Sequence, residues 1–141
     1  FILPNMFSED DLKPGTRLIP YTLQYLQGYK AGKNPEAPSF SAGLQIRQYI
    51  TLEEMIQTVD EAICKHITSG VYNVGGGDFL SIRNLIERLF AIYDVPCKDV
   101  YFGKEVRRDG DIKSLRIDGS KLKKEIGRLP DSKIEDIFKI K

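Results

Sequence analysis

Arginine side chains have the clearest chemical potential in this 141-residue sequence. Arg47 lies in an apolar stretch directly before a predicted helix start, and Arg108 lies in the segment RRDGD, where the glycine allows a sharp turn. A planar guanidinium matches two phosphate oxygens through parallel hydrogen bonds. Two arginines that reach one place from distant segments could therefore clamp a diphosphate. The alternative is that both are ordinary solvated arginines.

Three consecutive glycines at residues 75–77 are a second candidate. They follow the run VYNV and precede an apolar-periodic helix, and a helix N-terminus preceded by glycines can hold a phosphate. The spacing fits neither common nucleotide motif, because Leu80 stands where a dinucleotide fingerprint needs its third glycine and no Gly-Lys-Ser/Thr follows. The pattern favours a strand-to-helix turn with Ser81 as the N-cap, so these glycines are predicted to be structural.

Tyr29 and Lys33 have the spacing at which an ammonium on the same helix face can lower the pKa of a tyrosine for proton transfer. Gly32 places Lys33 at the helix end, and no partner serine or nucleotide loop accompanies the pair. We therefore interpret the pair as a solvated helix end. His66, the only histidine, ends the next predicted helix, where the helix dipole explains a cation better than catalysis does.

Composition and charge exclude several classes of protein. With 41% hydrophobic and 29% charged residues, one globular domain is expected. The net charge of +1 gives no field that attracts nucleic acid or a membrane. Cys64 and Cys97 lack metal or disulfide spacing, and Cys64 is expected in the core. Neither a membrane-spanning run of ~20 apolar residues nor a signal peptide is evident, so a cytoplasmic location is expected.

Apolar periodicity predicts the helices that must position these side chains. The first is expected to begin at Thr16 and to end at Gly32. The next begins with a capping box formed by Thr51 and Glu54. Further helices are predicted from Ser81, over residues 120–126 before Gly127, and from a second capping box at Ser132 and Glu135.

Short strands are predicted between these helices. FIL at residues 1–3 is typical of a strand that ends at Pro4, and LQIRQYI at residues 44–50 alternates apolar and polar side chains. VYNV, DVYFG and SLRID are shorter candidates. Strands that alternate with helices indicate an α/β fold.

The order of the segments resembles a known family. PN after a strand is followed by RLIPYTLQ, GLQIRQYITLEEM, GVYNVGGGDFLSIRNLI, RRDGD and IDGSKLKKEIGRLP. Over nearly the whole chain this resembles the C-terminal part of the extended short-chain dehydrogenase/reductases, the NAD-dependent nucleotide-sugar epimerases and dehydratases. The resemblance implies a small substrate-binding α/β domain over residues 1–141. It also implies that residues 1–5 and 71–93, which include a strand-helix unit, join a Rossmann domain absent from this sequence.

The resemblance also implies which residues bind the substrate. In that family a nucleotide-sugar is held at positions that are here Asn5, Arg47 and Arg108 for the diphosphate, Leu18 and Phe40 for the base, and Asp111 for the ribose or the orientation of Arg108. The sequence departs from the family pattern in two ways. NMFSED lacks the Gly-Pro that often follows the asparagine, and Gln48 and Glu54 replace two frequent aspartates.

The parent protein is therefore expected to be an NAD(P)-dependent enzyme, of which this segment, beginning at Phe1, is a piece with no catalytic, cofactor-binding or metal-binding residue of its own. A non-enzymatic binding or scaffold module is the alternative. A glycine fingerprint upstream of Phe1 would favour the enzyme. Without a partner domain, the apolar faces of residues 1–3 and 71–90 are expected to form an exposed patch, or to be covered in a homodimer or by exchanged segments.

Overall fold

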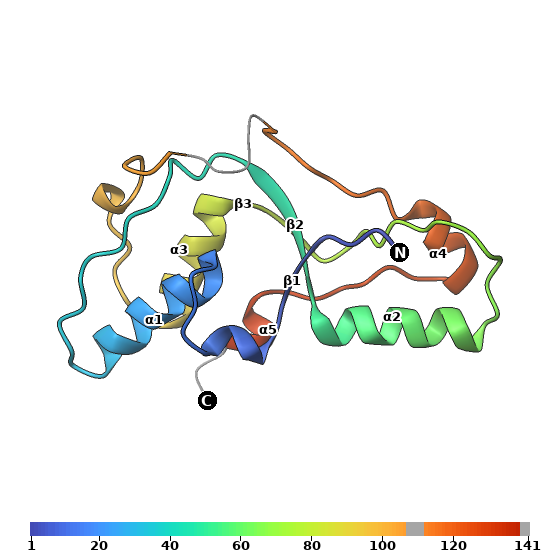
Figure 1. Ribbon diagram of the computed structural model, residues 1–141, viewed down its shortest axis with the longest axis horizontal. Helices are drawn as coiled ribbons and strands as arrows, with labels where there is room; N and C mark the ends of the chain where they lie inside the picture. Colours follow the sequence, from blue (N-terminus) through green and yellow to red (C-terminus); the bar gives the residue numbers. More distant parts are fainter. Residues whose placement is uncertain (107–111, 139–141) are drawn as a thin grey trace.

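The computed structural model describes residues 1–106 and 112–138 and contains a three-stranded sheet (Figure 1). The strands are β1 (Asn5–Phe7), β2 (Ile46–Thr51) and β3 (Asp78–Ser81), in the spatial order β1-β2-β3. β2 runs parallel to β1 and antiparallel to β3. The predicted α/β fold is confirmed, with the predicted strand LQIRQYI as the central strand.

The helices form two groups around this sheet. The described α-helices are α1 (Leu18–Lys30), α2 (Leu52–Cys64), α3 (Ile82–Ile92), α4 (Ser120–Ile126) and α5 (Glu135–Phe138). Two short 3-10 helices, η1 (Glu9–Leu12) and η2 (Asp99–Tyr101), accompany them. α3 contacts both α1 and α5, whereas α2 contacts α4 (Figure 1). Among the described residues, no helix is long and apolar enough to cross a membrane.

Each group of helices encloses its own apolar core. Tyr49 and Ile50 are consecutive residues of β2 and point to opposite faces, so Tyr49 lies in one core and Ile50 in the other. The first core joins α1, α3 and α5 through side chains that include Leu23, Leu26, Leu85, Leu89, Phe90 and Phe138. The second joins α2 and α4 through side chains that include Met55, Ala62, Leu122 and Ile126. The apolar stripe of α3 is therefore buried within this chain.

Two helix starts follow the sequence closely. The Ser81 hydroxyl accepts a hydrogen bond from the Asn84 amide at 3.0 Å, which confirms the predicted N-cap of α3. The Thr51 hydroxyl accepts from the Glu54 amide at 3.1 Å and caps α2. The capping box itself is incomplete, because the Glu54 carboxylate pairs with Arg128 at 2.8 Å rather than with the Thr51 amide.

The start of α1 differs from the prediction. Arg17, not Thr16, is the N-cap residue, and no side chain caps it. Pro20 lies within the first turn, where its missing N–H costs no helical hydrogen bond. Gly32 follows the helix with a φ of 70°, as its predicted place at the C-terminal end requires.

Several predicted strands are reduced to isolated bridges or are absent. Residues 1–3 make a single parallel bridge, from Ile2 to Asn73 in the predicted strand VYNV, and SLRID makes one from Ser114 to Ile46. DVYFG instead forms η2, because the Tyr101 amide bonds locally to the Lys98 carbonyl at 3.0 Å. Besides β1, the strand that pairs with β2 is β3, which follows the glycines rather than preceding them.

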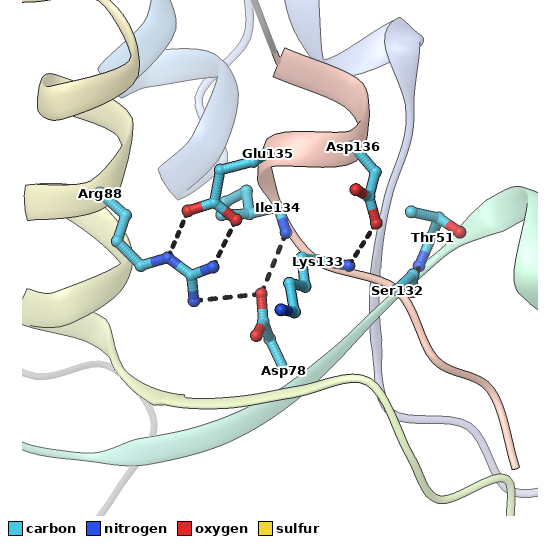
Figure 2. A network of polar contacts seen from close by, with 8 residues as sticks. All are labelled: Thr51, Asp78, Arg88, Ser132, Lys133, Ile134, Glu135 and Asp136. Carbon is cyan, nitrogen blue, oxygen red and sulfur yellow. Dashed lines mark hydrogen bonds and ion pairs between the residues drawn. The ribbon is translucent and has the colours of Figure 1, made fainter.

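Arg88 on α3 fastens the C-terminal segment to the sheet (Figure 2). Its guanidinium forms two parallel hydrogen bonds with the Glu135 carboxylate and an ion pair with Asp78 at 3.2 Å. Asp78 also accepts from the Ile134 amide at 3.0 Å. The Glu135 hydrogen bond raises the pKa of Arg88, and Arg88 lowers the pKa of Glu135, so both groups are charged at neutral pH.

The second predicted capping box is wrong. The Ser132 hydroxyl accepts from the Thr51 amide of β2 at 3.0 Å, while Asp136 accepts from the Lys133 amide at 2.7 Å (Figure 2). Ser132 is thus used for a contact distant in sequence. The expectation that Cys64 lies in the core is also wrong: Cys64 is the last residue of α2 and is exposed, as is Ile63 before it.

Candidate functional site

β2 places Arg47 and Tyr49 on the same side of the sheet, since alternate residues of a strand share a face. Asn5, the first residue of β1, is paired with Tyr49 in the register. All three residues line a pocket of about 550 Å³, which we call the Arg47 pocket. The starts of α1 and α3 complete its wall through Leu18 and Ile82.

The Arg47 side chain is held by backbone carbonyls. It is 9% exposed, and its two terminal nitrogens donate to the Ile46 carbonyl at 2.8 Å and to the Ile112 carbonyl at 3.1 Å. These bonds fix a planar cation at the junction of β2 with the segment that begins at Ile112. A group held in this way needs little reorganisation to receive an anion.

A second guanidinium lines the Arg47 pocket. Arg17 pairs with the buried carboxylate of Asp11 at 2.6 Å, and Asp11 also accepts from the Ser8 amide at 3.0 Å. The Arg17 side chain is 73% exposed, which leaves it accessible from the pocket. The described charged groups of the pocket, two arginines and one aspartate, are therefore net positive. Sequence reasoning missed Arg17, whose only signal was its place directly before LIPY.

An aromatic pocket of about 470 Å³, the Phe40 pocket, adjoins the first. Phe40 is 4% exposed, and its amide donates to the Tyr101 carbonyl at 2.7 Å. Its ring contacts Tyr21 edge-on at 5.8 Å and Phe102 at 5.5 Å. Leu18 and Ile82, which line the Arg47 pocket, line this pocket too, so the two hollows are neighbours.

The structure brings together the described residues that the resemblance singled out. Asn5 and Arg47 lie in the Arg47 pocket, Phe40 lies in the Phe40 pocket, and Leu18 lines both. Arg108 and Asp111 lie outside the described residues. The convergence of Arg47 with Arg108 therefore stays a prediction.

The three glycines serve close backbone packing. A Cβ on Gly75 would lie 2.3 Å from the Ile117 carbonyl oxygen, and one on Gly76 would lie 2.3 Å from that of Pro130. At Gly77 the nearest atom is the Tyr49 carbonyl oxygen, at 2.1 Å. Backbone already occupies the space that a cradled phosphate would need, which agrees with the structural interpretation of these residues.

The other candidates from the sequence lie apart from both pockets. α1 ends at Lys30, so Lys33 lies beyond the helix, and Tyr29 is 47% exposed. His66 lies past α2 and is exposed. Within residues 1–106 and 112–138, no group of His, Cys, Asp or Glu side chains is placed to hold a metal ion.

Comparison with known proteins identifies the fold. No protein-family model matches the chain, and no curated protein matches its sequence. Solved structures do match. RMD from Pseudomonas aeruginosa, complexed with NADPH, is 20% identical with a TM-score of 0.75, over 95% of this chain and 43% of that one. UDP-glucose 4-epimerase from Thermotoga maritima, with UDP-glucose, is 20% identical with a TM-score of 0.69, over 97% and 42%.

A third match is UDP-N-acetylglucosamine 4-epimerase from Methanobrevibacter ruminantium M1, which is 26% identical with a TM-score of 0.64, over 92% of this chain and 39% of that one. The chain has the fold of the C-terminal part of extended short-chain dehydrogenase/reductases. It spans about two-fifths of the length of these dehydrogenase/reductase structures. The Arg47 and Phe40 pockets thus lie in the part of the dehydrogenase/reductase fold that this chain covers.

Proposed function

We propose that this chain is the substrate-binding part of an NAD(P)-dependent epimerase or dehydratase that acts on nucleotide-sugars. One observation carries the proposal: a cationic pocket and an aromatic pocket adjoin and share Leu18 and Ile82. The nucleoside diphosphate part of a nucleotide-sugar has the same division, because a flat base lies at one end and a dianion at the other. The Phe40 pocket would receive the base, and the Arg47 pocket would receive the diphosphate.

The charges and aromatic groups support this orientation. Arg47 and Arg17 would bind phosphate oxygens, and the Asn5 amide, at the strand edge beside Tyr49, would donate a further hydrogen bond. Tyr21 and Phe40 would supply the apolar surface on which a base lies. In the proposal, Arg108 and Asp111 keep the diphosphate and ribose roles that the resemblance implies.

The ligands named for the matched structures favour uridine or thymidine diphosphate sugars. The Thermotoga maritima epimerase holds UDP-glucose, and the Methanobrevibacter ruminantium epimerase holds UDP-N-acetylmuramic acid. A dTDP-glucose 4,6-dehydratase from Bacillus anthracis, complexed with NAD, also matches this chain. The shared fold extends this substrate class to the present chain as a proposal.

The NAD(P) that we propose for the parent protein does not fit the described residues of this chain. The three-glycine loop that precedes β3 and α3 is filled by backbone at Gly75, Gly76 and Gly77. When bound elsewhere in the parent, NAD(P) would supply a hydride acceptor. This chain would supply binding energy far from the reacting carbon and so fix the position of the sugar.

A thermal-shift panel on the intact protein that contains this chain tests the proposal. We expect UDP or dTDP to raise the melting temperature more than inorganic phosphate does, because only the nucleotides would occupy both pockets. A ligand at 100 times its Kd stabilises the folded protein by about 2.7 kcal/mol. A panel in which no nucleoside diphosphate stabilises the protein would contradict it. Binding without turnover of any nucleotide-sugar, with NAD(P) present, would instead favour the non-enzymatic module.

We propose further that residues 1–5 and the start of the range 71–93 contact the nucleotide-binding domain of the parent. The α3 part of that range was expected to present an exposed apolar face, but its apolar stripe is buried against α1 and α5 of this chain. Phe1, Ile2 and Leu3 are 50%, 52% and 40% exposed, and Val71 is 67% exposed. Phe1 also lines a hollow of about 320 Å³ together with Ile63 of α2, itself 65% exposed. An exposed apolar surface of this kind is typical of an interface.

We expect the 141-residue chain by itself to self-associate through this surface. Light scattering after size exclusion should show oligomers whose mass falls toward that of a monomer in Ile63→Lys and Val71→Lys. Leu44→Lys is the control, because Leu44 is 75% exposed but lines neither that hollow nor the two pockets. A chain that is monomeric at all concentrations would argue against this interface.

A further inference from the structure

Gln45 is a buried polar residue in the wall of the Phe40 pocket. It is 8% exposed, and its side-chain oxygen is buried without a hydrogen-bond partner among residues 1–106 and 112–138. The other polar residues that line this pocket, Thr16, Ser39, Ser41 and Glu105, are half-buried or exposed. A buried acceptor left without a donor costs free energy, so its presence in a pocket wall calls for an explanation.

Gln48 shows what a structural glutamine looks like in the same segment. It is 6% exposed, and its side-chain nitrogen donates to the Gly76 carbonyl at 2.7 Å. Its side-chain oxygen accepts from the Ile117 amide at 2.9 Å. Both ends of the Gln48 amide are satisfied by backbone. The contrast with Gln45 therefore comes from the face on which each side chain lies.

Gln45 belongs to the row of residues that lines the two pockets. Its carbonyl accepts from the Ile82 amide at 3.0 Å, which continues the pairing of β2 with β3 by one residue. Gln45, Arg47 and Tyr49 are therefore alternate positions, about 7 Å apart, on the pocket side of the strand. Gln45 lines the Phe40 pocket, whereas Arg47 and Tyr49 line the Arg47 pocket.

We infer that Gln45 reads the base of the nucleotide: its side-chain oxygen accepts a hydrogen bond from the ring N3–H of uracil or thymine. This inference rests on the proposed function. The N3–H lies on the base edge away from the ribose and is flanked by carbonyls, so the Gln45 amide complements that edge with one acceptor and one donor. The ligand supplies the donor that the described residues do not. Arg47 contributes to binding of any nucleoside diphosphate, whereas Gln45 selects the base.

Calorimetric titration of the intact protein with UDP and with 3-methyluridine 5′-diphosphate tests this role, because the methyl group replaces the N3–H. We expect wild type to bind UDP about 10-fold more tightly than the methylated nucleotide, as the loss of one buried hydrogen bond implies. In Gln45→Leu, UDP binding should weaken about 10-fold and the ratio of the two affinities should fall to about 2-fold or less.

Gln48→Leu is the matched control. It removes the same amide group three residues away, where that amide makes two hydrogen bonds to backbone and lines neither pocket. Gln48→Leu should therefore lower the melting temperature and leave the ratio of the two nucleotide affinities unchanged. Gln45→Leu should melt no lower than wild type, since it removes an unsatisfied buried acceptor. A ratio in Gln45→Leu equal to that of wild type, or a wild type that binds both nucleotides equally, overturns the inference alone. A wild type that binds neither nucleotide overturns the proposed function with it.

Discussion

Replacing Arg47 by alanine should weaken binding of UDP and dTDP to the intact protein about 100-fold, because truncating a buried, hydrogen-bonded charge at a binding site typically costs 2–5 kcal/mol. The guanidinium is 9% exposed and is aimed by the Ile46 and Ile112 carbonyls. Arg47→Lys keeps the charge but loses the planar fork, so its binding should weaken by about 10-fold. Calorimetric titration gives each of these affinities.

Three controls separate the role of Arg47 in phosphate binding from a general effect on the fold. Arg116→Ala should change the affinity less than about 2-fold, because its guanidinium lies over the Phe79 ring and outside both pockets. Uridine, which has no phosphate, should bind wild type and Arg47→Ala equally. Thermal melts show that each variant is folded during the titration. A folded Arg47→Ala with wild-type affinity for UDP would refute the phosphate role.

The second large effect is expected at a glycine. Gly77→Ala should lower the free energy of unfolding by about 4 kcal/mol, which combines overpacking with the strain of a left-handed alanine. The added Cβ would lie 2.1 Å from the Tyr49 carbonyl oxygen and 2.7 Å from a methyl carbon of Ile50, at a φ of 69°. Neither neighbour can yield easily, because both belong to the central strand.

Gly32→Ala isolates the steric part of this effect. Gly32 has nearly the same φ, 70°, but a Cβ there would meet nothing within 4 Å. We expect this variant to lose only about 1 kcal/mol, the cost of the left-handed backbone. Urea unfolding of both variants measures the difference, and failure of Gly77→Ala to fold agrees with the expected loss. Equal stability of the two variants would show that the contact with β2 is not tight.

Local sequence determined the elements whose signals depend on near neighbours. The starts of α2 and α3 follow from the hydroxyls of Thr51 and Ser81. Each hydroxyl accepts a hydrogen bond from the backbone amide three residues later and so caps its helix. The apolar stripe of α3 predicted its buried face, whereas in α2 Met55 and Ala62 are buried but Ile56 and Ile63 of the same predicted stripe are exposed. Arg47 is a candidate from the sequence because it is a charged residue in a predicted strand with apolar neighbours, and a guanidinium can bind phosphate.

Contacts distant in sequence decided the features that local patterns got wrong. Ser132 was predicted to cap a helix, but its hydroxyl accepts from the amide of Thr51, 81 residues away. DVYFG has strand-forming residues, yet no described strand pairs with it and it closes into η2. Such competition between local and distant hydrogen bonds cannot be read from spacing alone.

The candidate site shows the same division. The sequence by itself determined that the chain is α/β, that residues 75–77 are structural glycines, and that Asn5, Leu18, Phe40 and Arg47 deserve attention. Only the tertiary structure decided that these side chains line two adjoining pockets. It also decided that Gln45 lines the Phe40 pocket, whereas the nitrogen and the oxygen of the Gln48 side chain are both hydrogen-bonded to backbone. The reason is that the Arg47 pocket forms where β1, β2, α1 and α3 meet, and the Phe40 pocket where α1 and α3 meet residues 39–41 and 105–106. These meetings depend on the packing of residues far apart in the chain.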